Sequence, residues 1–389
     1  MKGSSPLLAS YRTPAIGLVA LLVVGWVAMA TLDTATVSIL VLALYYAIAG
    51  TSFNFLYGSL GVFSLAQPIF LAVGGYTGVY LYNTYGISPW ISLFIAPVVA
   101  AIVALPVALA AVRAGGGAVL TALITLIISQ AILPILIVIK PLGGAVGMYV
   151  TLQEEPKAVD MQFADPAVFG QIFLILNVVM IAFLIIWQRS KLGYFATAIK
   201  DAPIASAAMG VPNSRIKILV FCIAAMIAAP AGVVYAQYNL LTTPDLFLGP
   251  TALFQVIVVA LVGGAARPWG TLLGALVMVY VSKTVSDLAN GAPGIGPLTF
   301  AAVFVIIALV MPRGFSGTWA ALVAKRQGFK GGAIATPGVT IELPPRDATT
   351  AEATADPDAL LDGDIDDGVI EPTRDTTGEP QGSGARHEG

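Results

Sequence analysis

Few side chains in this sequence could perform chemistry, and their positions do not assemble a reactive site. The only cysteine, Cys222, lies inside an apolar run, so the chain can build neither an internal disulfide nor a thiolate metal cluster. The only histidine, His387, is the third residue from the end, which removes histidine chemistry from the apolar part of the chain. Lys283 and Asp287 lie one helical turn apart, as in an interfacial ion pair. We expect no catalytic residue, no metal site and no enzyme.

The composition indicates that the solvent of this chain is a lipid bilayer. Of the 389 residues, 58% are hydrophobic and 10% are charged, a balance that would give a water-soluble globule an adhesive surface. The formal net charge of -2 hides a separation, because most bases precede residue 331 and most acids follow it.

Apolar segments of about the 20 residues needed to cross the hydrocarbon core occur six times, and four more are shorter or interrupted by glycine and proline. The six lie at about 15–32, 35–57, 90–112, 118–139, 168–188 and 217–238, and the four at about 63–82, 251–262, 268–283 and 296–311. We count the four as spans or re-entrant pieces. The sequence thus predicts an all-α transmembrane bundle of about ten helices at 15–317, after a cytoplasmic amino terminus at 1–14.

Basic residues sort to one side of this predicted bundle. With the amino terminus inside, thirteen Lys and Arg fall on the inner side and three on the outer side, as the positive-inside rule requires. Ten crossings place both termini in the cytoplasm of a multi-pass plasma (cell inner) membrane protein. The one long outer loop, at 140–167, carries Glu154, Glu155, Asp160 and Asp165 and is interpreted as a docking surface, a gate or a solvated cap.

The two ends of the chain have features of their own. Lys2 and Arg12, the short apolar region after them and Ala28-Met29-Ala30 also resemble a secretory signal with its cleavage site, whose removal would leave the later spans in the same orientation. Beyond about residue 331 the sequence holds thirteen acids against three arginines. Such a segment cannot bury enough apolar surface to offset its ordering entropy, so we expect a disordered acidic cytoplasmic tail at 318–389.

The inner loop at 189–217 is the most informative segment. It is long and basic, and it contains a run of small and apolar side chains between Pro203, which can start a helix, and Gly210, which can end it. Asp201 is placed to cap this helix, which would be about 11 Å long. Exposed apolar surface of this kind needs a partner, either another protein or the lipid headgroups.

The run at 200–210 and the bases after it resemble the EAA-like coupling loop of ABC importer permeases, specifically those for branched-chain amino acid uptake. In that family the loop docks a short helix into a groove of the ATP-binding subunit. The resemblance assigns the ATPase-coupling role to Lys200, Asp201, Ile204, Ala205, Ala208, Met209, Gly210, Arg215 and Lys217. Ala202 and Ala207 stand where the family often has acids, which points to packing rather than charge pairing.

Further stretches resemble the same family in the same order, over about residues 35–317. They lie at 58–77, 113–126 (typical of the LivM-type subunit), 141–147, 263–275 and 312–314, and most are rich in glycine. Glycine lets backbones approach closely or leave the helix where a polar path must pass. The residues expected to line that path, or else to tie helices together by hydrogen bonds, are Asn54, Ser64, Gln67, Thr77 and Thr125.

The resemblance implies the membrane permease subunit of an ATP-driven importer. The chain has no G-x-x-x-x-G-K-[ST] loop, so we expect no cofactor of its own and ATP on partner subunits. Implied partners are two ABC ATPase subunits, a second, LivH-type permease chain, an extracellular solute-binding protein and membrane lipid, without nucleic acid. The cargo would be a branched-chain or other small amino acid. Urea, short amides or a sugar are alternatives within the family, and an ATP-independent secondary carrier or channel is the alternative outside it.

Overall fold

The computed structural model describes residues 6–115, 117–155, 157–264, 269–288, 298–299, 301–302 and 305, with the backbone alone at 6–16 and 286–288. The predicted span at 296–311 lies mostly outside these residues, and the five of its positions that are described are helical. The predicted tail at 318–389 lies entirely outside the described residues.

Helices make up most of the described chain, and a two-residue strand pair joins two of its loops. The elements are α1 (Pro6–Thr31), α2 (Thr34–Leu60), α3 (Gln67–Tyr85), α4 (Pro89–Arg113), α5 (Ala118–Val138), the 3₁₀ turn η1 (Lys140–Leu142), β1 (Met148–Tyr149), η2 (Ala158–Asp160), α6 (Pro166–Gln188), α7 (Lys191–Asp201), α8 (Pro203–Ala208), α9 (Asn213–Asn239), β2 (Leu241–Thr242), α10 (Pro244–Leu248), α11 (Pro250–Gly263) and α12 (Gly270–Leu288). Nine of the ten predicted apolar segments therefore contain a helix.

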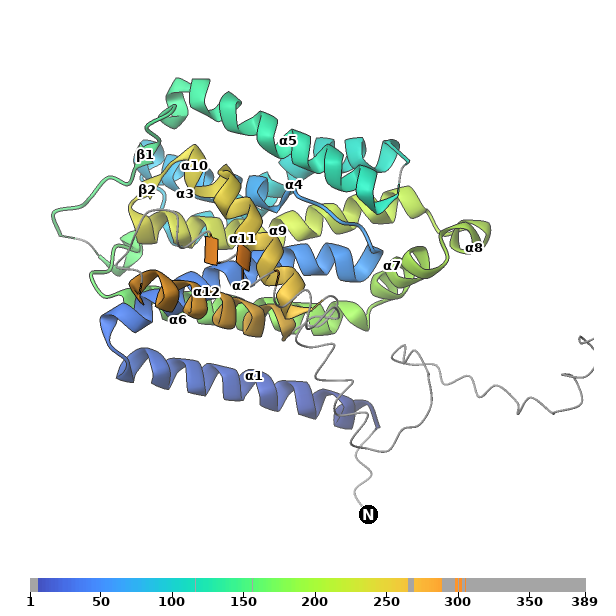
Figure 1. Cartoon of the computed structure of the whole chain (residues 1–389), viewed down its shortest axis with the longest axis horizontal. Coiled ribbons are helices and arrows are strands. Elements are labelled where there is room, and N and C mark those ends of the chain that lie inside the picture. The colour runs from blue at the N-terminus through green and yellow to red at the C-terminus, as the bar shows by residue number, and fades with distance from the viewer. Residues whose placement is uncertain are drawn as a thin grey trace, which may run out of the picture. The chain divides into compact units, whose positions relative to one another are not determined.

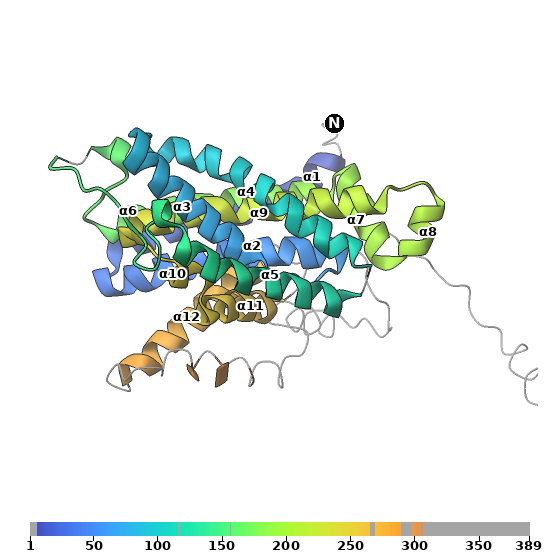
Figure 2. The same ribbon diagram turned by 90° about the horizontal axis from the view of Figure 1, so that it is seen from above.

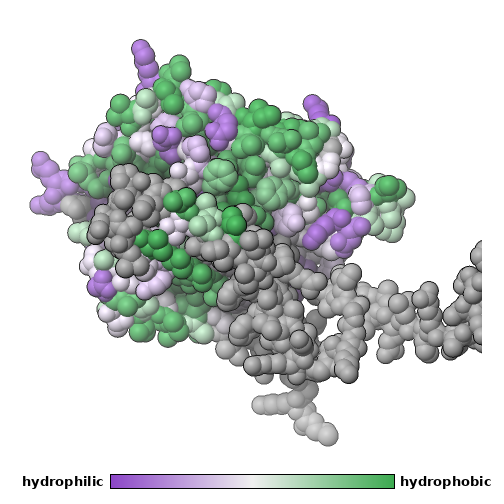
Figure 3. All heavy atoms as spheres, in the orientation of Figure 1, coloured by the Kyte–Doolittle hydropathy of each residue, from purple (hydrophilic) through white to green (hydrophobic). Residues whose placement is uncertain are grey.

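Six helical segments in the described part of the chain are long and apolar enough to cross a membrane. They are α2, α4, α5, α6, α9 and the combined segment Pro244–Gly263, and shorter apolar pieces lie at Gly17–Thr31 and Gly270–Val285. Hydrophobic residues cover the middle of the face seen in Figure 3, and hydrophilic residues gather toward its two ends. This distribution suits a helical bundle in lipid, while the number of ten spans remains a prediction.

The bundle is built around α2 and α9. Helix α9 packs against α3 and α4, and α2 packs against α6, α9, α11 and α12, whereas α1 contacts α6 and α5 lies at the margin in Figure 1. The contact between α3 and α9 depends on glycine, because a Cβ at Gly74 would lie 2.0 Å from the carbonyl oxygen of Ala229. Small residues allow such close backbone approach in membrane helices.

The two ends of the bundle carry different structures, as Figures 1 and 2 show. Helices α7 and α8 lie at one end, called the α8 end below. At the opposite end, the strand end, β1 and β2 pair antiparallel with Met148 opposite Thr242. At this end Asp33 caps α2, and its hydrogen bonds from the hydroxyl and backbone N–H of Thr36 lower the pKa of its carboxyl below the usual value.

Two helices are interrupted inside the bundle. The predicted helix at 63–82 begins only at Gln67, because α2 ends in a left-handed cap at Gly61 and the next residues are not helical. Helix α11 likewise ends at Gly263, and its cap residue Gly264 has a φ of 90°. The side-chain amide of Asn54, six residues before the end of α2, donates a hydrogen bond of 2.9 Å to the Gly264 carbonyl. Side chains thus satisfy backbone groups that a continuous helix would have paired.

Candidate coupling segment and translocation path

Helix α8 forms where the sequence predicts a short helix, with one correction at its start. It begins at Pro203, but the predicted cap is wrong, because Asp201 ends α7 and the cap residue is Ala202. Alanine has no side-chain oxygen, so Ala202 cannot accept a backbone N–H of the first turn as a capping residue does. The helix ends at Ala208, and Gly210 turns the chain two residues later at a φ of 82°.

Two polar side chains hold α8 against the start of α9. The hydroxyl of Ser206 donates to the Pro203 carbonyl at 3.0 Å and contacts Oδ1 of Asn213 at 3.2 Å, and Nδ2 of Asn213 donates to the same carbonyl at 2.8 Å. Ser206 is the only buried residue of α8. These bonds turn the apolar side chains outward, so that Ile204 is 85% exposed and Met209 74% exposed.

The other predicted coupling residues surround this exposed helix. Ala205, Ala208, Gly210, Asp201 and Arg215 are exposed, and Lys217 is half-buried. Lys200 has a distinct role, because its Nζ donates to the carbonyl of Gly58 at 3.1 Å and so ties α7 to the end of α2. The segment is therefore linked to both central helices, α2 and α9.

Three of the five predicted path residues form hydrogen bonds that tie the interrupted backbone together. Asn54 bonds to Gly264, as described above. The hydroxyl of Ser64 accepts the Ala66 N–H at 3.3 Å, and the hydroxyl of Thr125 accepts the Leu65 N–H at 2.9 Å. These bonds agree with the expected alternative, that such residues tie helices together, and a place on the path stays a prediction for all three.

Gln67 differs from those three. Its side chain is 1% exposed, and neither amide atom has a hydrogen-bond partner among the residues that the structure describes. It opens α3, which begins inside the bundle beside Pro68 and has no side-chain cap from Ala66. Burying an unpaired amide costs free energy, so Gln67 stays a candidate for the path.

Thr77, the fifth candidate, lies in the wall of a cavity of about 660 Å³ between α3, α4 and α5. The wall is otherwise almost entirely apolar and includes Ile69 and Tyr76 of α3, Val103 of α4 and Ile132 of α5. No local sequence pattern predicts this cavity, because its three walls come from separate parts of the chain.

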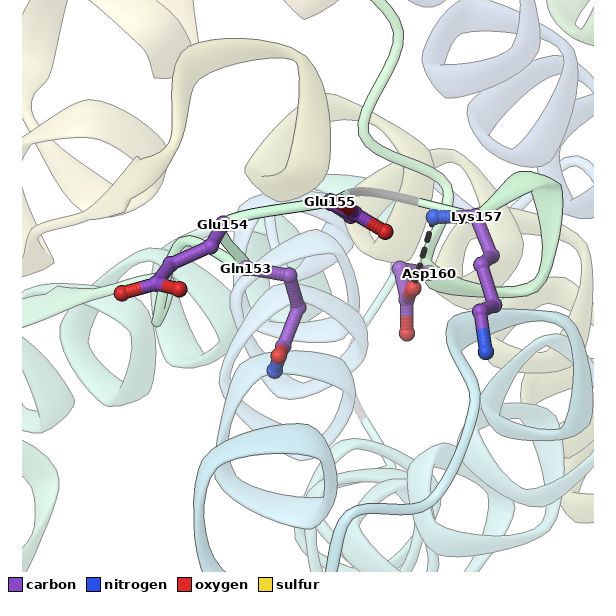
Figure 4. Close-up of a pocket in the computed structure, with 5 residues that line it drawn as sticks. All are labelled: Gln153, Glu154, Glu155, Lys157 and Asp160. Atoms are coloured by element: carbon purple, nitrogen blue, oxygen red, sulfur yellow. Dashed lines mark hydrogen bonds between the residues drawn. The ribbon is translucent and has the colours of Figure 1, made fainter.

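A second cavity, of about 610 Å³, lies in the loop at the strand end. Its lining residues are Gln153, Glu154, Glu155, Lys157 and Asp160, shown in Figure 4. The Asp160 carboxylate accepts the backbone N–H of Lys157 at 3.0 Å, which is the dashed line in Figure 4. The loop is attached to the bundle, since the indole of Trp90 donates to the Ala158 carbonyl at 2.9 Å. Among the described residues, no group of three or more His, Cys, Asp or Glu could hold a metal.

Sequence reasoning missed several buried polar groups that lack partners. Within the described chain these include the hydroxyls of Tyr76, Ser129 and Thr242 and the amide of Gln237. A signal for one of them was present, because Thr121, Thr125 and Ser129 repeat at the four-residue spacing of one helix face.

The fold and these sites define an integral membrane protein of the transporter class. Its apolar helices are interrupted beside buried polar side chains, and a short exposed helix, α8, lies at one end of the bundle. The described residues include no group of His, Cys, Asp and Glu that could hold a metal.

Residues 35–311 match the family described as the permease component of the branched-chain amino acid transport system, and the chain belongs to that family. The chain is similar to the high-affinity branched-chain amino acid transport system permease protein LivM of Escherichia coli K12, with 26% identity over 296 residues, or 69% of this chain and 68% of the relative. LivM of Salmonella typhimurium is 24% identical over 294 residues, covering 69% and 68%. LivH of Salmonella typhimurium is 26% identical over 146 residues, covering 38% and 46%. No solved structure matches the chain.

Proposed function

We propose that this chain is the membrane-spanning permease subunit of an ATP-binding-cassette importer for branched-chain amino acids, and that α8 couples it to separate ATPase subunits. One observation carries the coupling role: α8 presents apolar side chains outward although polar bonds hold it firmly to α9. Ordered, exposed apolar surface of this kind is typical of a docking site. Membership of the permease family supports transport rather than catalysis.

The connections of α8 suggest how a movement would reach the bundle. Asn213, which clamps α8, is the first residue of α9, and Lys200 joins α7 to α2. A displacement of α8 would therefore act on both central helices. ATPase subunits with different contacts in their nucleotide-bound and nucleotide-free states would bias the bundle between two conformations.

In this proposal the two ends of the bundle face opposite sides of the membrane and meet different partner proteins. The α8 end faces the cytoplasm together with both termini, and the strand end faces outward, where the acid-bearing loop would receive a solute-binding protein. The permease chain would pair with a second, LivH-type chain, since relatives of both types are similar to it. Two ATPase subunits would complete the transporter.

Introducing a charge on α8 tests the coupling role. Ala205→Glu and Ala208→Glu should lower uptake of labelled leucine by about tenfold or more, because a carboxylate in an apolar contact loses its hydration without gaining a partner. Uptake is measured in cells that depend on this transporter, with the membrane content of each variant determined by immunoblot. Ala205→Ser preserves the small size and should retain most of the uptake.

A second pair of variants separates docking from positioning. Asn213→Ala removes the clamp but leaves the outward side chains intact, so uptake should fall while the adjacent Ser214→Ala, at an exposed position, stays close to wild type. Normal uptake in both glutamate variants would refute the role of α8.

A further inference from the structure

Helix α5 buries a polar face and exposes an apolar one. Its buried residues are Thr121, Thr125 and Ser129. They repeat every four positions and so lie on one side of the helix. Side chains on other sides are apolar and exposed, such as Ile127 at 67%. A helix that only filled space at the margin of the bundle would bury apolar residues instead.

The hydroxyl face of α5 lies on the same side of the helix as residues that line the cavity between α3, α4 and α5. Ile132, one turn after Ser129, lines this cavity, as do Leu136 and Ile139 further along the same helix. On α3 the lining begins at Ile69, four residues after Leu65, whose N–H bonds to Thr125. The hydroxyl face and the wall of the cavity therefore follow each other along one side of α5, and this side together with the cavity is called the lane below.

Polar groups in this lane lack partners. The hydroxyls of Ser129 and Tyr76 form no hydrogen bond with any part of the chain that the structure describes, although both are buried. Pro134 has no N–H, so it also deprives the Gln130 carbonyl of its usual helical partner. A lipid chain would fill the apolar wall but would leave these groups unpaired. An amphipathic ligand satisfies both the wall and the polar groups.

We propose that this lane is the path of the amino acid through the permease. The cavity holds the branched aliphatic side chain, and the hydroxyls of Ser129 and Tyr76 donate to the carboxylate of the amino acid. The lane then continues along Thr125 and Thr121 toward the α8 end. This inference rests on the proposed function and adds to it a selectivity site in this chain.

Changing the volume of the cavity tests the lane through selectivity, which does not depend on how much protein reaches the membrane. Uptake of leucine, alanine and phenylalanine is compared in cells carrying the complete transporter. Ile132→Phe should lower the ratio of leucine to alanine uptake by about tenfold, and Ile132→Ala should raise the ratio of phenylalanine to leucine, because each methylene in such a pocket changes discrimination by roughly this amount. The same substitutions at Ile127, on the exposed side of α5, should leave both ratios unchanged.

Removing the hydroxyls tests the carboxylate contact. Ser129→Ala and Tyr76→Phe should each raise the apparent KM for leucine by about tenfold, the effect expected for a lost hydrogen bond to a charged group. Ser129→Thr, which retains the hydroxyl, should restore uptake.

The outcomes distinguish this inference from the proposed function. Unchanged ratios in both Ile132 variants of a working leucine transporter would overturn the lane and leave the function standing. A uniform loss of uptake for all three amino acids, with constant ratios, would assign the cavity to lipid or to the second permease chain and would also overturn it. A wild-type transporter that moves none of the three would overturn both.

Discussion

At the scale of single residues, the buried polar side chains fall into two groups. Those with hydrogen-bond partners stabilise the bundle: the hydroxyl of Ser52 donates to the Ala224 carbonyl at 2.7 Å, and the amide of Asn177 donates to the Leu44 carbonyl at 3.0 Å. Others, such as Gln67, are equally buried and have no partner within the described residues. Groups of the second kind cost stability, which is the expected signature of a functional position.

Replacing Gln67 by leucine should therefore separate stability from transport. Gln67→Leu removes an unpaired buried amide at similar volume, so the melting temperature in detergent should stay the same or rise. We expect leucine uptake to fall severalfold, because Gln67 is a predicted path residue and leucine has no polar group to replace its amide.

The control substitution should have the opposite result, a loss of stability with little change in uptake. Ser52→Ala breaks a formed hydrogen bond and should lower stability by about 0.6 kcal/mol, the average for such bonds in a membrane protein, with little effect on uptake per folded molecule. Wild-type uptake in Gln67→Leu would show that this amide does not contact the path.

At the scale of elements, the bundle depends on backbone contact between α3 and α9. Gly74 lies against the Ala229 carbonyl, and Gly232 lies against that of Leu71, where a Cβ would again stand 2.0 Å from oxygen. A side chain at either position would force two helices of the core apart.

Gly74→Ala should consequently destabilise the bundle, by about 1–3 kcal/mol, the usual range for overpacking a close contact. Thermal unfolding in detergent, followed by circular dichroism, measures the change. Gly117→Ala is the matched control, because its φ of -60° suits any residue and a Cβ there would meet nothing within 4 Å. Equal melting temperatures for the two variants would contradict the close α3–α9 contact.

At the scale of the whole molecule, the proposal requires the two ends of the bundle to face opposite sides of the membrane. Cys222 is the only cysteine in the sequence, so a Cys222→Ser background allows single reporters to be placed. Glu154 and Met209 are both exposed and lie in the loop at the strand end and beside α8, respectively.

Labelling of Glu154→Cys and Met209→Cys should reveal this sidedness. A membrane-impermeant maleimide should modify Glu154→Cys in intact cells and Met209→Cys only after permeabilisation, because the reagent cannot cross lipid. The reverse pattern would place α8 outside the cell, away from any ATPase.

The sequence by itself determined the features that depend only on residues close to one another along the chain. Runs of apolar side chains predicted helices because their length and hydropathy are local properties, and Pro203 predicted the start of α8 because its fixed φ suits a first helical turn. The predicted cap at Asp201 was wrong, since the path of α7 up to that residue is not visible in the local pattern. The family resemblance was equally accessible, as it rests on ordered motifs.

Only the tertiary structure decided which buried polar groups have partners. The bond from Asn54 to Gly264 spans 210 residues, and the bond from Leu65 to Thr125 spans 60, so no local pattern separates these residues from Gln67. The cavity likewise exists only because three helices converge. Hydrogen bonding and packing are satisfied in space rather than along the chain, which is why the cavity was found only in the fold.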